Sequence, residues 1–66
     1  MEKRTTAIQQ TLERAVHGGG TAVIVASTLG AQEVAELKQM GLMVTRLPSE
    51  FRVYPAGTRG VLGTPI

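Results

Sequence analysis

The sequence predicts a small α/β (α+β) domain, in which two helices pack on one face of a three-stranded mixed sheet, in the order helix, strand, helix, strand, strand. Three features predict this class. An amphipathic stripe opens the chain, an unbroken apolar run follows three glycines, and the segment after Gly41 alternates apolar and polar residues. We expect one domain over residues 1–54 and a glycine- and proline-containing C-terminal arm over residues 55–66.

The first helix is expected over residues 3–17. Its apolar side chains fall on one helical face, at Ile8, Leu12, Ala15 and Val16. Thr5 or Thr6 could cap a start near residue 6. Gly18–Gly20 should end the helix, because glycine readily takes the left-handed conformation that follows a helix.

The first strand is expected over Thr21–Ala26. A strand that is apolar at every position has no face intended for water. A chain of 66 residues, however, can cover only one face of a sheet well. We therefore expect a second copy or a partner to cover the other face or the edge of this strand.

The second helix is expected to start at Gly30 and to end at Gly41, with Glu33 placed as half of a capping box. Val34 and Leu37 mark its apolar face. Two alternating strands follow, over Leu42–Leu47 and Phe51–Tyr54, and the short connection between them predicts an antiparallel hairpin.

Two sheet orders fit this arrangement. The strands lie in chain order, or the third strand inserts between the first and the second. In both orders the strand over residues 21–26 is an edge, and the strand–helix–strand unit places its strands parallel. An edge with no charge and no proline invites pairing with another strand.

Composition narrows the classes of function. The net charge is +2 and no run of five like charges occurs, so nucleic acid is not an expected partner. There is no cysteine and only one histidine, so we expect no disulfide, no metal site within one chain and no cofactor. The apolar run is far shorter than the roughly 20 residues that span a bilayer, so no membrane association is expected.

An enzyme is not expected either. His17–Gly20 matches the glycine-rich oxyanion loop of lipases and esterases, but the nucleophile elbow that such a loop serves is absent. We interpret His17 as a last-turn residue that interacts with the helix dipole. Glu33 and Glu36 lie three residues apart on the second helix, where a solvated face is the expected role.

Contacts with other molecules are expected from three places: the first strand, the outward face of the hairpin and the arm. Arg46, Arg52 and Tyr54 are expected to share one outward patch, of the type enriched at interfaces. The full set of expected interface residues is Val23, Val25, Met43, Arg46, Leu47, Arg52, Tyr54, Val61, Leu62 and Ile66.

The chain also resembles a class of very short bacteriophage proteins. The resemblance is carried by Ala15–Gly18, by Val23–Val25, by Glu33–Gly41 with its Leu-Lys-x-x-Gly ending, and by Val44. It covers residues 5–54 and concerns fold rather than chemistry. This chain departs from the pattern at Gly30, where a serine or aspartate cap is usual, and in its additional arm. The resemblance implies a phage origin and brings no active site.

The leading hypothesis is a non-enzymatic, self-associating protein of phage type that serves as a structural or assembly component of the virion. Its expected partners are itself and another viral or host protein. Synthesis in the host cytoplasm and incorporation into the virion are the expected locations. The alternative is a small phage inhibitor that binds one host protein, in anti-defence or host takeover, and a third hypothesis is a weak nucleic-acid binder.

Overall fold

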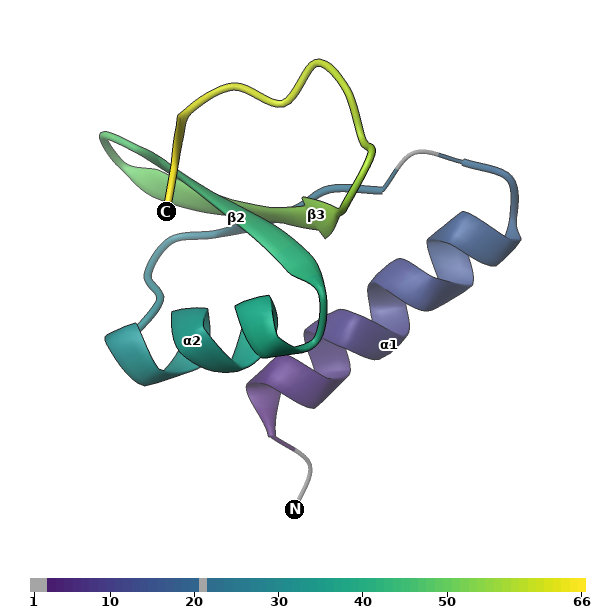
Figure 1. Cartoon of the computed structure of the whole chain (residues 1–66), viewed down its shortest axis with the longest axis horizontal. Coiled ribbons are helices and arrows are strands. Elements are labelled where there is room, and N and C mark those ends of the chain that lie inside the picture. The colour runs from purple at the N-terminus through teal and green to yellow at the C-terminus, as the bar shows by residue number, and fades with distance from the viewer. Residues whose placement is uncertain (1–2, 21) are drawn as a thin grey trace.

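The computed structural model describes residues 3–20 and 22–66, which form two helices and a four-stranded sheet. The elements in chain order are α1 (Arg4–His17), β1 (Ile24–Ala26), α2 (Ala31–Gln39), β2 (Leu42–Leu47), β3 (Glu50–Pro55) and β4 (Thr64–Pro65). Both helices lie on one side of the sheet, and the chain after β3 crosses the opposite side (Figure 1). The predicted α+β class is confirmed.

The strand order is β1-β3-β2-β4, and each neighbouring pair is antiparallel. The third strand therefore inserts between the first two, which is one of the two orders that the sequence allows. β1 and β2 run in the same direction but are not neighbours. The prediction of a three-stranded mixed sheet was wrong, because β3 separates the two parallel strands and the arm supplies a fourth strand.

The first helix forms because its apolar stripe meets the sheet and α2. Ile8 and Leu12 are buried, while Val16 is exposed. The helix begins at Arg4, and the expected threonine caps were wrong, since Lys3 is the N-cap and no side chain caps the start. At the other end the N–H of Gly18 donates to the carbonyl of Arg14 at 3.0 Å.

The second helix is bounded by two glycines, as predicted. Gly30 is the N-cap, and its N–H donates to Glu33 Oε1 at 3.1 Å, which is the expected half of a capping box. Gly41 has a φ of +84°, and its N–H donates to the carbonyl of Lys38 at 3.0 Å. This left-handed glycine turns the chain directly from α2 into β2.

The core lies between the helices and the sheet. Val44 is paired with Val53, and Val53 is paired with Ile24 on its other side, so one apolar row crosses three strands. Leu12 and Leu37 of the two helices are also almost fully buried and belong to the same cluster. Each such side chain stabilises the fold by about 1.5–3 kcal/mol through its removal from water.

The first strand is shorter than expected, and it has two different faces. It covers Ile24–Ala26, and Thr21 lies outside the described residues. Ala26 is buried and Ile24 packs against the core, whereas Val25 between them is 57% exposed. The prediction that this strand has no face toward water was therefore wrong, because the helices cover only one side of it.

Candidate interaction surface

The two edges of the sheet differ in what covers them. β1 pairs with β3 on one side, and its other side, named here the free edge, has no strand beside it among residues 3–20 and 22–66. β2 pairs with β3 on one side and with β4 on the other. The prediction that the first strand lies at an edge is confirmed, and the arm covers the opposite edge.

The free edge has no charged side chain and no proline. Val25 is 57% exposed and Val23, just before the strand, is 38% exposed. The nearest charge across the ladder is Arg52, which is opposite Val25. Its Nε donates to Glu50 Oε2 at 2.9 Å, so the two charges are paired within β3. This edge lacks the lysines and prolines by which edge strands commonly avoid pairing, and its length of three residues limits the number of bonds that it can form.

The C-terminal arm folds back on its own chain, and it begins at residue 56 rather than at the expected residue 55, because Pro55 belongs to β3. Its β4 residues Thr64 and Pro65 pair with Arg46 and Thr45. The N–H of Ile66 donates to the carbonyl of Val44 at 3.0 Å, so pairing continues past β4. The arm therefore occupies the edge of β2.

A second contact fixes the arm over the sheet. The hydroxyl of Thr45 donates to the carbonyl of Leu62 at 3.1 Å, and Thr45 is only 2% exposed. This bond supplies the partner that a buried hydroxyl requires. The arm thus covers part of the sheet face that is opposite the helices.

Gly63 lies close against β2. Its φ is +113°, and a Cβ at this position would lie 2.9 Å from Leu47 Cδ1, 3.0 Å from the Arg46 carbonyl oxygen and 3.1 Å from Thr45 Cβ. Gly60 provides a contrast, since its φ is +79° and no atom lies within 4 Å of its Cβ position. Only glycine fits at residue 63 without displacing its neighbours.

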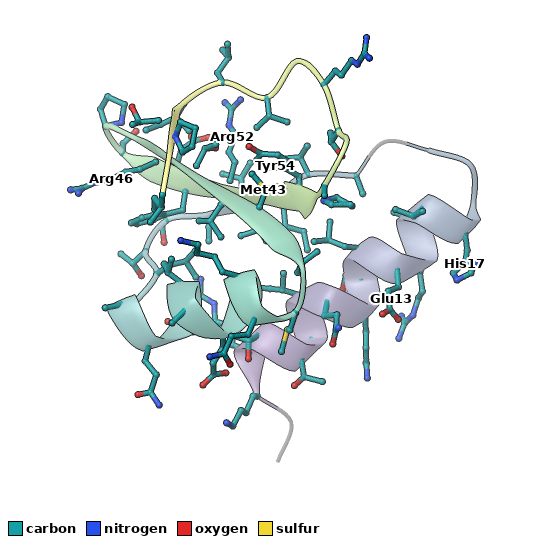
Figure 2. The ribbon with its side chains drawn as sticks, in the orientation of Figure 1. Glu13, His17, Met43, Arg46, Arg52 and Tyr54 are labelled. Atoms are coloured by element: carbon teal, nitrogen blue, oxygen red, sulfur yellow. The ribbon has the colours of Figure 1, made fainter. Side chains whose placement is uncertain are left out.

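The expected outward patch of Arg46, Arg52 and Tyr54 was wrong. Arg46 is opposite Phe51, on the face that carries the helices, while Thr45 is opposite Arg52. Tyr54 is on the outward face but is only 8% exposed. Arg52 and Tyr54 point to the side of the sheet that the arm crosses (Figure 2). The period of two in β2 places Arg46 on the same face as Val44, and Tyr54 is buried on the face that the arm crosses.

The remaining predicted interface residues fall into two groups. Val23 and Val25 lie at the free edge of β1. Met43 is exposed and Leu47 is half-buried on the outward face, which the arm crosses. The arm itself carries the half-buried Val61 and the exposed Leu62 and Ile66. Val25 is opposite Arg52 and so shares the outward face with Met43 and Leu47, whereas the sheet order separates β1 from β4 by two strands.

Sequence reasoning missed Thr45 and Gly63, which hold the arm in place. Thr45 gave no signal, because threonine is common in strands whether or not its hydroxyl is buried. The arm did carry a signal in its glycines. Gly57, Gly60 and Gly63 recur every three residues, and all three have positive φ. The spacing is visible in the sequence, but the conformation of the three glycines is known only from the structure.

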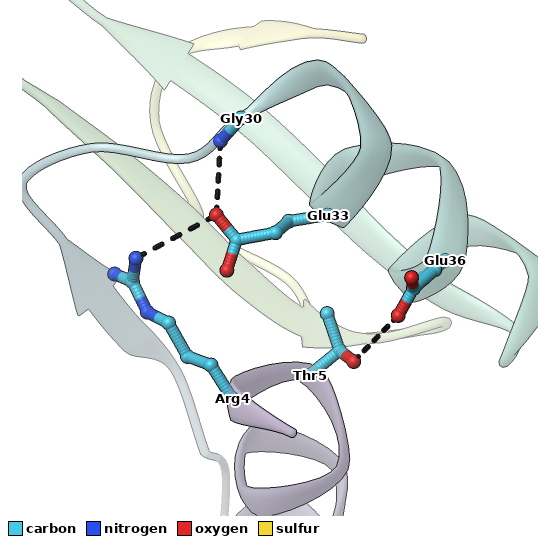
Figure 3. Close-up of polar contacts among 5 residues, drawn as sticks. All are labelled: Arg4, Thr5, Gly30, Glu33 and Glu36. Atoms are coloured by element: carbon cyan, nitrogen blue, oxygen red, sulfur yellow. Dashed lines mark hydrogen bonds and ion pairs between the residues drawn. The ribbon is translucent and has the colours of Figure 1, made fainter.

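A polar cluster joins the N-terminus of α1 to α2 (Figure 3). The hydroxyl of Thr5 donates to Glu36 Oε2 at 2.8 Å, and Lys3 Nζ lies 3.6 Å from Glu36 Oε1. Arg4 Nη1 lies 3.7 Å from Glu33 Oε1. The expectation that Glu33 and Glu36 form a purely solvated face was wrong, because both are half-buried and bind the first turn of α1.

Other chemistry on the described part of the chain is sparse. Residues 3–20 and 22–66 contain no group of three His, Asp or Glu side chains able to hold a metal ion. Within the same residues, neither helix combines the length and the apolar character needed to cross a membrane. His17 is exposed in the last turn of α1, at the position expected for it (Figure 2).

No family model, no curated protein and no solved structure matches this chain. Function is therefore inferred from the edges of the sheet and from the arm. Of these, the free edge of β1 is apolar and exposed, and the edge of β2 is occupied by residues of the same chain.

Proposed function

We propose that this chain is a small, non-enzymatic structural or assembly component of a virion, of the phage type, whose copies join through the free edge of β1. The observation that carries the proposal is the exposure of an apolar, uncharged strand that has, among the described residues, no neighbouring strand on one side. A row of unpaired backbone N–H and C=O groups beside exposed valines is a template for another strand.

The simplest contact is between two identical edges. Antiparallel pairing of β1 with β1 of a second copy relates the copies by a two-fold axis, so that each contributes the same surface. Centred on Val25, such a pair brings the two Val25 side chains together on one face, where β-branched cross-strand pairs contribute about 0.2–1 kcal/mol. The two sheets then form one continuous sheet.

The strength of this contact is modest. Three residues on each side form about two to four backbone hydrogen bonds, which contribute about 0.5–1.5 kcal/mol each. Association costs at least about 4 kcal/mol in lost freedom of motion, so burial of Val23 and Val25 has to supply the remainder. We therefore expect a concentration-dependent dimer with a Kd of roughly micromolar to millimolar.

The test is the native mass of the wild-type chain and of Val25→Lys as a function of concentration, by sedimentation or light scattering. We expect wild type to approach twice the 7.0 kDa chain mass, and Val25→Lys to weaken the dimer at least about tenfold, because a charge at an edge opposes pairing. The matched control is Val16→Lys, which makes the same change at a 50% exposed valine on α1. It should leave the dimer unchanged.

A wild-type chain that stays monomeric at millimolar concentration, or a Val25→Lys variant that pairs like wild type, would contradict the proposal. The role in the virion has its own test, which is the copy number in purified particles. Many copies per particle are expected. The alternative is a host-directed inhibitor that uses the same edge. It would be favoured if the chain were absent from particles and captured one host protein in a fixed ratio, and if Val25→Lys abolished that capture.

A further inference from the structure

We infer that the edge of β2 is a second strand-pairing site, which accepts β1 of another copy when the C-terminal arm leaves it. With the arm in place this site is closed. The inference rests on the proposed pairing of β1, and it adds a second acceptor for that strand. The two acceptors have different consequences for the size of the assembly.

The arm closes the edge in two ways. It occupies the backbone groups of β2 from Val44 to Arg46, through the bonds of Ile66 and the pairing of β4. It also presents a poor edge of its own, because β4 has only two residues and Pro65 has no N–H to donate. A strand that approaches this side of the sheet meets no adequate template.

Beneath the arm lies a longer edge than that of β1. β2 has six residues, Leu42–Leu47, and pairs with β3 along its whole length. Only Thr45 and Arg46 are in register with β4. Release of the arm therefore exposes the backbone of a strand that is already paired in register with β3.

The direction of the strands makes β1 a suitable occupant. β1 and β2 run in the same direction within one chain, because each is antiparallel to β3. A second copy displaced along the sheet therefore places its β1 beside β2 in parallel orientation. This contact joins two different surfaces, and each added copy again presents an open β2.

The state of the arm thus sets the form of the assembly. With the arm seated, the free edge of β1 can join only another β1, and the two-fold contact closes at a dimer. With the arm released, β1 can join β2 of the next copy, and head-to-tail contacts of this kind continue without closing. The arm converts an open-ended sheet into a closed pair.

Gly63 provides the variant that tests this inference in the full chain. Gly63→Ala places a Cβ against Leu47, Thr45 and the Arg46 carbonyl, so the arm should leave β2. We expect light scattering to show assemblies well above the dimer mass, and the amide of Ile66 to lose its protection from hydrogen exchange. The matched control is Gly60→Ala, which also sits at positive φ but has open space around it. It should retain the wild-type mass.

Two further measurements separate ordered growth from aggregation of an unfolded chain. The Gly63→Ala/Val25→Lys double variant should keep the arm released but stop growing, because the donor strand is blocked. A peptide with the sequence of residues 58–66, added to Gly63→Ala, should restore the dimer mass, and the same peptide with Gly63→Ala should not. Growth that neither Val25→Lys nor the wild-type peptide reduces would overturn the inference.

The remaining outcomes are also decisive. One outcome separates the two ideas. If Val25→Lys weakens the dimer, the proposed function stands. If Gly63→Ala then remains a dimer although its Ile66 amide has lost protection, the inference fails. If Val25→Lys has no effect on wild type, the proposed function itself fails. If the arm stays on β2 in Gly63→Ala, the bulkier Gly63→Phe is used to displace it. A Gly63→Phe variant that still has the mass of a dimer would count against the inference.

Discussion

Thr5 shows how one side chain can decide the relative position of two helices. It is buried near the start of α1, and its hydroxyl donates to the carboxylate of Glu36 on α2. The first turn of α1 therefore reaches α2 through a buried bond as well as through the more exposed contacts of Lys3 and Arg4. Ion pairs with exposed partners contribute little on their own, so the hydrogen bond of the Thr5 hydroxyl stabilises the contact between the helices more than these ion pairs do.

Removal of this hydroxyl should destabilise the fold. We expect Thr5→Ala to lower the free energy of unfolding by about 1–2 kcal/mol, because a hydrogen bond to a charged group is lost beside a half-buried carboxylate. Thr11→Ala is the control, since Thr11 is an exposed threonine of the same helix whose hydroxyl bonds only to the Ala7 carbonyl. Urea unfolding of both variants measures the difference, and equal stabilities would show that the bond contributes nothing.

The side-chain pattern predicted the core better than the surface. Alternation in β3 correctly assigned Phe51 and Val53 to the helix side, because the period of a strand is fixed by its backbone. The same rule places Arg46 on the face of Val44. The expected patch of Arg46 with Arg52 therefore disagreed with the alternation of β2. The alternation of β3 also places Tyr54 on the outward face, but it does not indicate that Tyr54 is buried there.

At the scale of elements, both helices and the hairpin follow from local signals. Glycines mark the end of each helix, and the short connection fixes the pairing of β2 with β3. The position of β1 beside β3 was left open, since two orders satisfy the same local patterns. β4 was not predicted, because a two-residue strand gains its pairing from long-range contacts rather than from its own sequence.

The sheet order predicts an ordered series of local stabilities. β3 is paired on both sides, whereas the terminal β4 pairs only with β2 through two residues in register. We expect amide hydrogen exchange to be slowest in β3, near the limit set by global unfolding, and fastest among the strands for β4 and Ile66. Equal protection of Ile66 and Val53 would show that the arm and the central strand open together.

At the scale of the whole molecule, the strand of the proposed contact carries no charge of its own, and the charge beside it is Arg52, opposite Val25. Lys3 and Arg4 pair with glutamates of α2, and Arg52 pairs with Glu50 in its own strand. Ile24–Ala26 carries no charge. The contact between two copies therefore depends on backbone hydrogen bonds and apolar burial, and not on attraction between charged surfaces.

This distribution predicts how association responds to salt. Raising sodium chloride from about 0.05 to 1 M should change the dimer Kd by less than about threefold, because screening acts mainly on exposed charges. Sedimentation at both concentrations measures it. A dimer that dissociates at high salt would place the contact on a charged surface.

A matched titration with nucleic acid should show no binding at physiological salt, where contacts to phosphates would be needed.

The order of the strands in space has a consequence for synthesis of the chain. Among residues 3–20 and 22–66, β1 pairs with β3 alone, and β3 ends at Pro55, 29 residues after the last residue of β1. At translation rates of about 5–20 residues per second, residues 27–55 follow β1 after about 1.5–6 s. During that interval β1 has no native strand to pair with. The pairing of β1 with β3 therefore forms only after nearly all of the described residues have been synthesised, and slower translation would delay it.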